Sequence, residues 1–151
     1  MSSPEENIMT MLKDRQVPHE VIEHKPVANN VATAEALGVS LGDTVKSLML
    51  ETTEGEIILV VVPGDQRFDS KRLTAKAGTK RVVFAKPEKV LEYAGCEVGC
   101  VPPFGHSKTV RVFVDETLLS KGQVYFNAGT HTKSVKIEAL RLPELGVMIR
   151  F

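Results

Sequence analysis

The sequence lacks several features that mark common protein classes. It contains no tryptophan, only two cysteines and no net charge, with 19 Lys+Arg against 19 Asp+Glu in 151 residues. Without excess positive charge there is no global basic field to attract nucleic acid, so we do not expect DNA as a partner, and RNA would need a local basic patch.

The apolar runs are well short of the roughly 20 residues that cross a bilayer. The stretch Met1–Glu6 has neither the basic nor the apolar region of a secretory signal. We therefore expect a cytoplasmic protein without a membrane partner.

Familiar catalytic signatures are also missing. There is no G-x-S-x-G nucleophile turn, no Walker A loop and no G-x-G-x-x-G. Cys96 and Cys100 are spaced C-x3-C without a second Cys/His pair, which argues against structural zinc and favours incidental thiols. We expect no metal and no cofactor, so that any catalysis would rest on positioning a substrate and a water molecule against backbone donors and a lysine.

Capping residues, turns and hydrophobic spacing predict a chain of short helices and strands. The 151 residues are enough for one well-buried domain, and no repeat or linker divides them. We therefore expect a single α/β or α+β domain over residues 1–151. The helices are expected over 4–16, 34–37 (capped by Thr33), 70–77, 87–93, 116–119 and 138–142, and the strands over 20–23, 44–50, 57–62, 81–84, 109–114, 123–126 and 134–137, with 44–50 and 57–62 antiparallel.

Lys46 is the sharpest single candidate for a functional residue. It lies inside an apolar strand, where an ammonium group must reach solvent, find a carboxylate or point into a polar cavity. As a functional cation it suits a phosphate or a polarised carbonyl, while an outward-facing strand lysine is an equally good interpretation of the spacing alone. Asp65, Arg67 and Lys71 follow the neighbouring strand and are candidates for a polar rim, although Pro-Gly-Asp is also ordinary turn chemistry.

The segment 99–106, Gly-Cys-Val-Pro-Pro-Phe-Gly-His, predicts a stiff, shaped loop. The prolines fix φ and the flanking glycines permit turns or close approach of a ligand. Such a loop suits a pocket wall, because a stiff wall has little entropy to lose when a ligand binds.

Five stretches in this order resemble one known family: Val45–Leu48, Val62–Asp69, Gly99–His106, Val114–Glu116 and Asn127–Gly129. The chain resembles the YbaK/aminoacyl-tRNA synthetase-associated domain family, whose members are free-standing proteins similar to the editing domain of bacterial prolyl-tRNA synthetase. The resemblance runs from about Val21 to Leu145. It implies a mixed, mostly antiparallel, barrel-like sheet surrounded by helices.

The same resemblance implies a function and a site. The function is hydrolysis in trans of the ester on mischarged tRNA, typically tRNA for proline carrying alanine, cysteine, serine or threonine. The implied partners are the aminoacyl-tRNA acceptor end and an aminoacyl-tRNA synthetase. Lys46 matches the family's motif lysine, and Gly99 and Pro103 match its Gly-x-x-x-Pro loop. Residues that would shape substrate binding in the variable parts of the loop and beyond are Val101, Pro102, Phe104, Gly129 and His131.

Two other readings stay open at this stage. One is a binding module of the same fold that recognises an acceptor end or a synthetase without hydrolysis. The other is an enzyme for a small ester or amide unrelated to tRNA, which would make the neutral charge less surprising. Lys71, Arg72, Lys76 and Lys80 are candidates for an RNA-binding patch, with a solvated helix face as the simpler interpretation.

Overall fold

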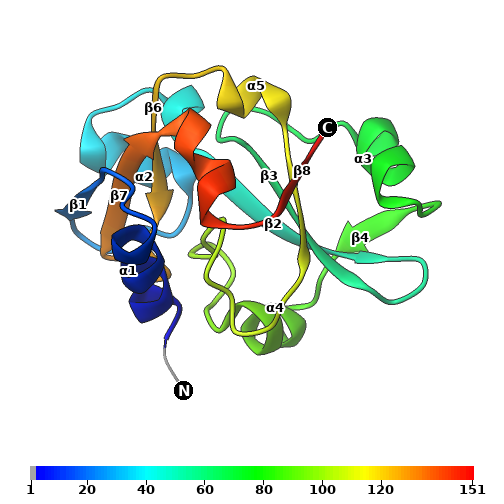
Figure 1. Ribbon diagram of the computed structural model, residues 1–151. Coiled ribbons are helices and arrows are strands. Elements are labelled where there is room, and N and C mark those ends of the chain that lie inside the picture. Colours follow the sequence, from blue (N-terminus) through cyan, green and yellow to red (C-terminus); the bar gives the residue numbers. More distant parts are fainter. Residues whose placement is uncertain (1–2) are drawn as a thin grey trace.

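A computed structural model describes residues 3–151, and its strands form two sheets (Figure 1). Residues 1 and 2, part of the N-terminal stretch considered above, lie outside this range. The smaller sheet has the order β1-β7-β6, from β1 (Glu20–Glu23), β7 (Lys133–Glu138) and β6 (Gln123–Asn127). The larger has the order β4-β2-β3-β5-β8, from β4 (Val82–Phe84), β2 (Val45–Thr52), β3 (Ile57–Pro63), β5 (Arg111–Val114) and β8 (Met148–Arg150).

The expected mixed α/β fold with mostly antiparallel strands is confirmed. Four of the six strand pairings among residues 3–151 are antiparallel, and β3–β5 and β5–β8 are parallel. The strands of this range do not close into a barrel. The two sheets meet instead at one bridge, between Thr44 and Tyr125.

Helices cover the sheets, and most begin at the residue that the sequence indicates. Ser3, Asp69 and Asp115 each accept a backbone N–H of the helix that follows, as expected for N-caps. The helices are α1 (Pro4–Asp14), α2 (Asn30–Leu37), α3 (Ser70–Ala77), α4 (Pro87–Ala94) and α5 (Glu116–Leu119), with 3-10 turns η1 (Leu41–Asp43) and η2 (Ala139–Leu145).

Three details differ from the sequence-based expectation. The cap of α2 is Asn29 rather than Thr33, because the Asn29 side chain accepts the N–H of Ala32 while Thr33 is buried within the helix. The helix expected over 138–142 is a 3-10 segment with Pro143 inside it. The strand β8 was not expected at all, since three residues carry too little pattern.

The five-stranded sheet is apolar on both faces. On one face Leu50, Ile58 and Val60 pack against Leu73 of α3. The opposite face joins a larger core that includes α1, α4, the smaller sheet and the loop that follows α4. The segment β3 is buried at every residue, as its unbroken run of apolar side chains predicts. The candidate site lies on the side of this larger core.

Candidate functional site

A cavity of about 460 Å³ opens beside the first half of β2. Its volume falls within the range of roughly 300–1,000 Å³ that is usual for small-molecule sites. It is lined by residues 28–30 before α2, by residues 45–49 of β2, by parts of 84–90 around the start of α4, by parts of 98–101, and by Asn127 at the end of β6. Each of these five segments, which are far apart in the sequence, thus forms one wall of the cavity.

Two adjacent cavity-lining residues of β2, Lys46 and Ser47, point to opposite faces of the sheet. Successive side chains of a strand point to opposite faces. Val45 and Met49 belong to the larger core, so Ser47 between them shares their face. Lys46 alternates with Leu48, which packs against the α3 side. Lys46 and Ser47 both line the cavity, but of these two only Ser47 directs its side chain toward the larger core.

Lys46 is half-buried and lies near charges of both signs. Burial is the main reason that its pKa is below that of an ordinary lysine, and the positive charge of Arg67 lowers it further. Asp65 acts in the opposite sense and raises it. No ion pair within the described range 3–151 neutralises Lys46. Asp65 and Arg67 are thus close enough to Lys46 to influence its charge. Neither of them lines the cavity, so the predicted polar rim of Asp65, Arg67 and Lys71 is not part of its wall.

Gly99 lies where one wall meets another. Its φ is +96°, and a Cβ added to it would stand 2.6 Å from the carbonyl oxygen of Ala28. The side-chain amide of Asn127 donates to the Gly99 carbonyl oxygen at 2.9 Å. Glycine is needed here both for the left-handed backbone and for the close approach to residue 28.

The rest of the Pro-Pro loop (residues 99–106) is fixed by contacts on the side away from the cavity. The His106 ring donates from Nε2 to the carbonyl oxygen of Pro102 at 2.7 Å, and burial lowers the pKa of His106. The Phe104 ring meets Phe126 edge-on, with 5.3 Å between centroids. Of the predicted loop residues, Gly99 and Val101 line the cavity. Pro103 and Phe104 instead line a separate depression that includes His106, and Pro102 is buried.

His131 supports the cavity without lining it. Its Nδ1–H donates to the carbonyl oxygen of Val27 at 2.8 Å, and Nε2 lies 3.3 Å from a carboxylate oxygen of Glu97. The bond to Val27 is the main cause that raises the pKa of His131, and Glu97 adds to it. This ring therefore ties the segment before α2 to the loop that carries Gly99.

Two further predicted residues lie away from the cavity. Gly129 packs on α1, since an added Cβ would stand 2.9 Å from the side chain of Pro4. Lys71 is exposed on α3. Any influence of these two on a ligand in the cavity would be indirect or would concern a larger ligand.

The sequence did not indicate two features of the cavity: the buried polar atoms of Ser47 and Asn127 in its interior, and the exposed apolar residues Phe84 and Val98 at its mouth. The Oγ of Ser47 and the Oδ1 of Asn127 are buried and have no hydrogen-bond partner. Buried polar atoms are almost always paired, so two unpaired atoms in the lining of one cavity need an explanation. At the mouth, Phe84 is 67% exposed and Val98 is 59% exposed. The Phe84 ring is supported edge-on by Phe68, with 6.5 Å between centroids.

The two cysteines lie next to the cavity loop as free, buried thiols. Each thiol donates to a backbone carbonyl oxygen, Cys96 to that of Cys100 at 3.7 Å and Cys100 to that of Glu97 at 3.3 Å. The interaction between the two side chains is the main influence on both pKa values. It lowers the pKa of Cys100 to about 7, helped by the nearby His131, and raises the pKa of Cys96, to which burial also contributes. Cys100 is consequently the more acidic thiol of the pair.

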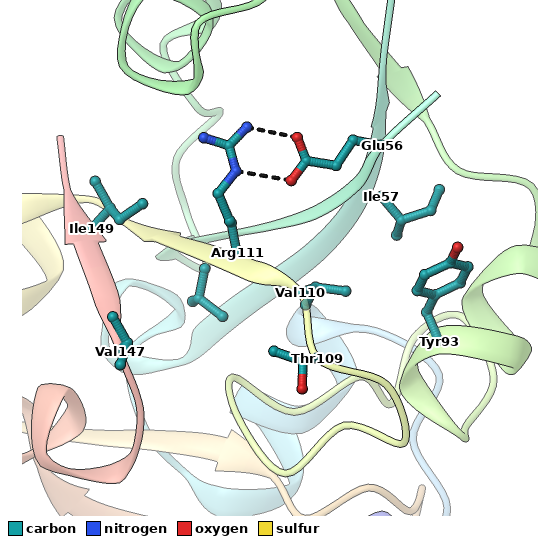
Figure 2. A pocket seen from close by; sticks show the side chains of 9 residues that line it. Glu56, Ile57, Tyr93, Thr109, Val110, Arg111, Val147 and Ile149 are labelled. Atoms are coloured by element: carbon teal, nitrogen blue, oxygen red, sulfur yellow. Dashed lines mark hydrogen bonds and ion pairs between the residues drawn. The ribbon is translucent and has the colours of Figure 1, made fainter. Parts of the chain in front are cut away.

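A second cavity, of about 440 Å³, lies between β5, β8 and α4 (Figure 2). Its main polar groups are Arg111 and Glu56, which bind each other through two hydrogen bonds of 2.8 and 2.7 Å. Arg111 also donates to the carbonyl oxygen of Ala77 at 3.0 Å. Because these charged groups already bind one another, the side-chain polar groups left in this lining are the hydroxyls of Tyr93 and Thr109.

The described part of the chain has neither a cluster of metal ligands nor a membrane-spanning helix. Within residues 3–151, no three His, Cys, Asp or Glu side chains come together as metal ligands. No helix in that range has the length and apolar character required to cross a bilayer.

Comparison with known proteins decides the family. Residues 24–145 match the model of the aminoacyl-tRNA editing domain. The chain belongs to this family. The match covers almost the same span as the resemblance seen in the sequence, and it confirms the expectation of an aminoacyl-tRNA editing hydrolase at the level of the family.

Individual relatives of this editing domain include both free-standing and fused proteins. The chain is 28% identical over 134 residues to the multifunctional Ser/Thr-tRNA deacylase ProXp-y of Escherichia coli K12, covering 86% of this chain and 80% of that one. It is 34% identical over 97 residues to a proline--tRNA ligase of Brachyspira hyodysenteriae, covering 62% of this chain but 17% of the ligase. A solved structure described as "a putative trans-editing enzyme for prolyl tRNA synthetase" superimposes with a TM-score of 0.84 at 27% identity, covering all of this chain and 96% of the other.

Proposed function

We propose that this editing domain acts in trans as an aminoacyl-tRNA deacylase on mischarged tRNA, with tRNA for proline carrying alanine, cysteine, serine or threonine as the substrate class. The observation that carries the proposal is the cavity itself, whose lining includes Lys46 and Gly99, two of the three motif residues, at one site of suitable size. The printed names of the relatives, a tRNA deacylase and a trans-editing enzyme, support the same class.

In this reaction a water oxygen attacks the ester carbonyl carbon, and negative charge develops on the carbonyl oxygen. The bond from that carbon to the ribose oxygen then breaks, the ribose oxygen takes up a proton, and free amino acid leaves. Backbone N–H groups stabilise such an oxyanion. The N–H of Cys100 is already bonded to the carbonyl of Glu97, and the prolines donate none. Of the loop residues that line the cavity, Gly99 and Val101 carry the N–H groups for this task.

Lys46 supplies positive charge at the edge of the cavity. In the proposal it holds the terminal phosphate or the carbonyl region of the ester, and the vicinal ribose hydroxyl of the substrate helps to activate water. This division would explain why no protein side chain stands out as a general base. Asp65 and Arg67 would set the charge of Lys46 rather than touch the ester.

The mouth of the cavity suits the end of an RNA chain. Phe84 offers an exposed aromatic face, and bases stack on aromatic rings without regard to sequence. The basic residues on α3 and after it, Lys71, Arg72, Lys76 and Lys80, are exposed and would meet the phosphates beyond the terminal nucleotide. A prolyl-tRNA synthetase is the partner that would supply the mischarged tRNA, and the cytoplasm is where we expect both.

The experiment is to measure ester release from tRNA-Pro charged with each of the four amino acids. Wild type should hydrolyse at least one of these esters. Lys46→Ala should lower kcat/KM by roughly 100-fold or more, as removal of one charge-stabilising group does elsewhere. Lys13→Ala, which removes an exposed lysine of α1, is the matched control and should leave the rate unchanged.

The result also separates the alternative of a non-catalytic binding module. Wild-type protein that binds these tRNAs but releases no amino acid from any of them would overturn the enzymatic proposal in favour of that alternative. Full activity of Lys46→Ala would overturn the role given to the lysine.

A further inference from the structure

The pairing of β2 with β3 leaves the peptide groups of Ser47 turned away from β3. In an antiparallel ladder both backbone groups of a residue point to the same neighbour, and the direction alternates along the strand. Ser47 is opposite Val61, but the Val61 carbonyl accepts the N–H of Asp115 on its other side, at 2.9 Å. Ser47 and Val61 are thus a pair without mutual hydrogen bonds.

The neighbours of Ser47 show where its peptide groups point instead. The Val45 carbonyl accepts the side-chain amide of Asn30 at 3.0 Å, and the Met49 carbonyl accepts the N–H of Ala85 at 3.0 Å. Both bonds lie on the edge of β2 that borders the cavity. Ser47 stands between them on the same edge, where β4 has already ended. Its N–H and C=O therefore face the cavity.

The Ser47 side chain adds a third polar group to the same wall. Its Oγ is buried on the apolar face that it shares with Val45 and Met49, and it has no partner. The Oδ1 of Asn127, held by the bond from its own amide to Gly99, is the second orphan. The cavity thus offers a backbone donor, a backbone acceptor, an amide acceptor and a hydroxyl.

We infer that Ser47 is a specificity-determining residue, and that its hydroxyl selects amino acids with a hydroxyl side chain, serine and threonine, over alanine. The inference rests on the proposed deacylase function. The α-ammonium group that every aminoacyl ester carries matches two acceptors, the Asn127 oxygen and the Ser47 carbonyl oxygen. The Ser47 N–H is a further donor for the ester carbonyl, beside those of Gly99 and Val101. The Ser47 Oγ is left for the side chain.

The chemistry of the wall favours a hydroxyl at that point. An ammonium group beside the apolar face of Val45 and Met49 would be costly to desolvate. A methyl group would leave the Ser47 hydroxyl unsatisfied, whereas a hydroxyl both donates and accepts and so restores its bond. A site that is built to bond a substrate hydroxyl rejects the analogue that lacks it.

The test compares one tRNA-Pro transcript charged separately with serine, threonine and alanine. Wild type should have a higher kcat/KM for the seryl and threonyl esters than for the alanyl ester. Ser47→Ala should reduce that preference by roughly tenfold or more, mainly through slower hydrolysis of the hydroxyl-bearing esters. Ser40→Ala, at an exposed serine, is the matched control and should keep the preference. Asn127→Ala should slow all three esters together.

A second readout distinguishes this role from a structural one. Because the Ser47 hydroxyl is an orphan in the free protein, its removal should leave the melting temperature unchanged or raise it. An active wild type whose seryl-to-alanyl preference is the same in Ser47→Ala would overturn the assignment of Ser47 alone. A wild type inactive on all three esters would overturn the proposed function and this inference with it.

Discussion

The backbone of Gly99 lies against the carbonyl oxygen of Ala28, so that a Cβ on Gly99 would stand 2.6 Å from that oxygen. Two walls of the cavity are in contact here without any side chain between them. The two cavity walls can approach this closely at Gly99 and Ala28 because residue 99 has no Cβ.

Gly99→Ala should push these walls apart and abolish most of the activity. The left-handed φ of +96° adds backbone strain, which costs about 1–3 kcal/mol at a residue other than glycine. Gly55→Ala is the matched control, because Gly55 has a φ of +87° but nothing within 4 Å of an added Cβ. Thermal unfolding should show both variants destabilised, and deacylation assays should show only Gly99→Ala inactive. Equal activity of the two variants would contradict the wall-spacing role.

Phe84→Ala should weaken substrate binding without harming the fold. The ring is 67% exposed, so its loss removes little buried surface. If it stacks on the terminal base, KM should rise roughly tenfold, given that a base–aromatic stack contributes about 1–3 kcal/mol. Phe84→Tyr should keep the low KM, and Val147→Ala, at an apolar residue that is 90% exposed elsewhere, should have no effect. An unchanged KM in Phe84→Ala would remove the ring from the binding surface.

The contact between His131 and Glu97 should make stability depend on pH. The pKa of His131 is raised in the folded state, chiefly by its bond to Val27 and further by Glu97. A raised folded pKa means that the stabilisation is complete below the ordinary histidine value of about 6.5 and is lost as pH rises through the folded value. Glu97→Gln should therefore lower the free energy of unfolding at acidic pH, by at most about 1 kcal/mol for such an exposed pair. Denaturant titrations should show this difference disappear as pH rises through the folded pKa of His131, and a difference that grew with pH would be the opposite of what we expect.

The Arg111–Glu56 pair should give the reverse pH dependence (Figure 2). The hydrogen bond from Arg111 is the main cause that lowers the pKa of Glu56. A lowered folded pKa means that the stabilisation is present above the unfolded value of about 4.3 and is lost as pH falls through the folded value. Glu56→Gln should cost up to about 1 kcal/mol at neutral pH, since both side chains are partly exposed. Thermal melts of wild type and variant should converge in acid, while deacylation at neutral pH should stay at the wild-type rate.

The sequence was informative where local chemistry decides the structure. Helix caps at Ser3, Asp69 and Asp115 and the unbroken apolar run of β3 follow from neighbouring residues alone. Lys46 was singled out as a charge in an apolar strand, and the loop of Gly99 by its two prolines and flanking glycines. The role of Gly99 in the site came from the family resemblance.

What the sequence missed depends on distant segments. The importance of Ser47 follows from where β4 ends, and that of Asn127 follows from its bond to Gly99, 28 residues away. The Pro-Pro loop was expected to face a ligand with most of its length. Only its first part does so, because Phe104 is drawn into the core by Phe126.

The register of β2 with β4 explains why the pairing of these strands stops before Ser47, at the position of Pro87. Leu50 is opposite Phe84 and Glu51 is opposite Val83, so a continued strand would bring residue 87 opposite Ser47. Proline has no N–H to offer the Ser47 carbonyl, and here it begins α4 instead. The peptide groups of Ser47 therefore have no partner strand, because Pro87 prevents β4 from continuing opposite them. An aminoacyl group bound at Ser47 would supply the missing hydrogen-bond partner, in the way that a bound peptide adds a strand to the edge of a sheet.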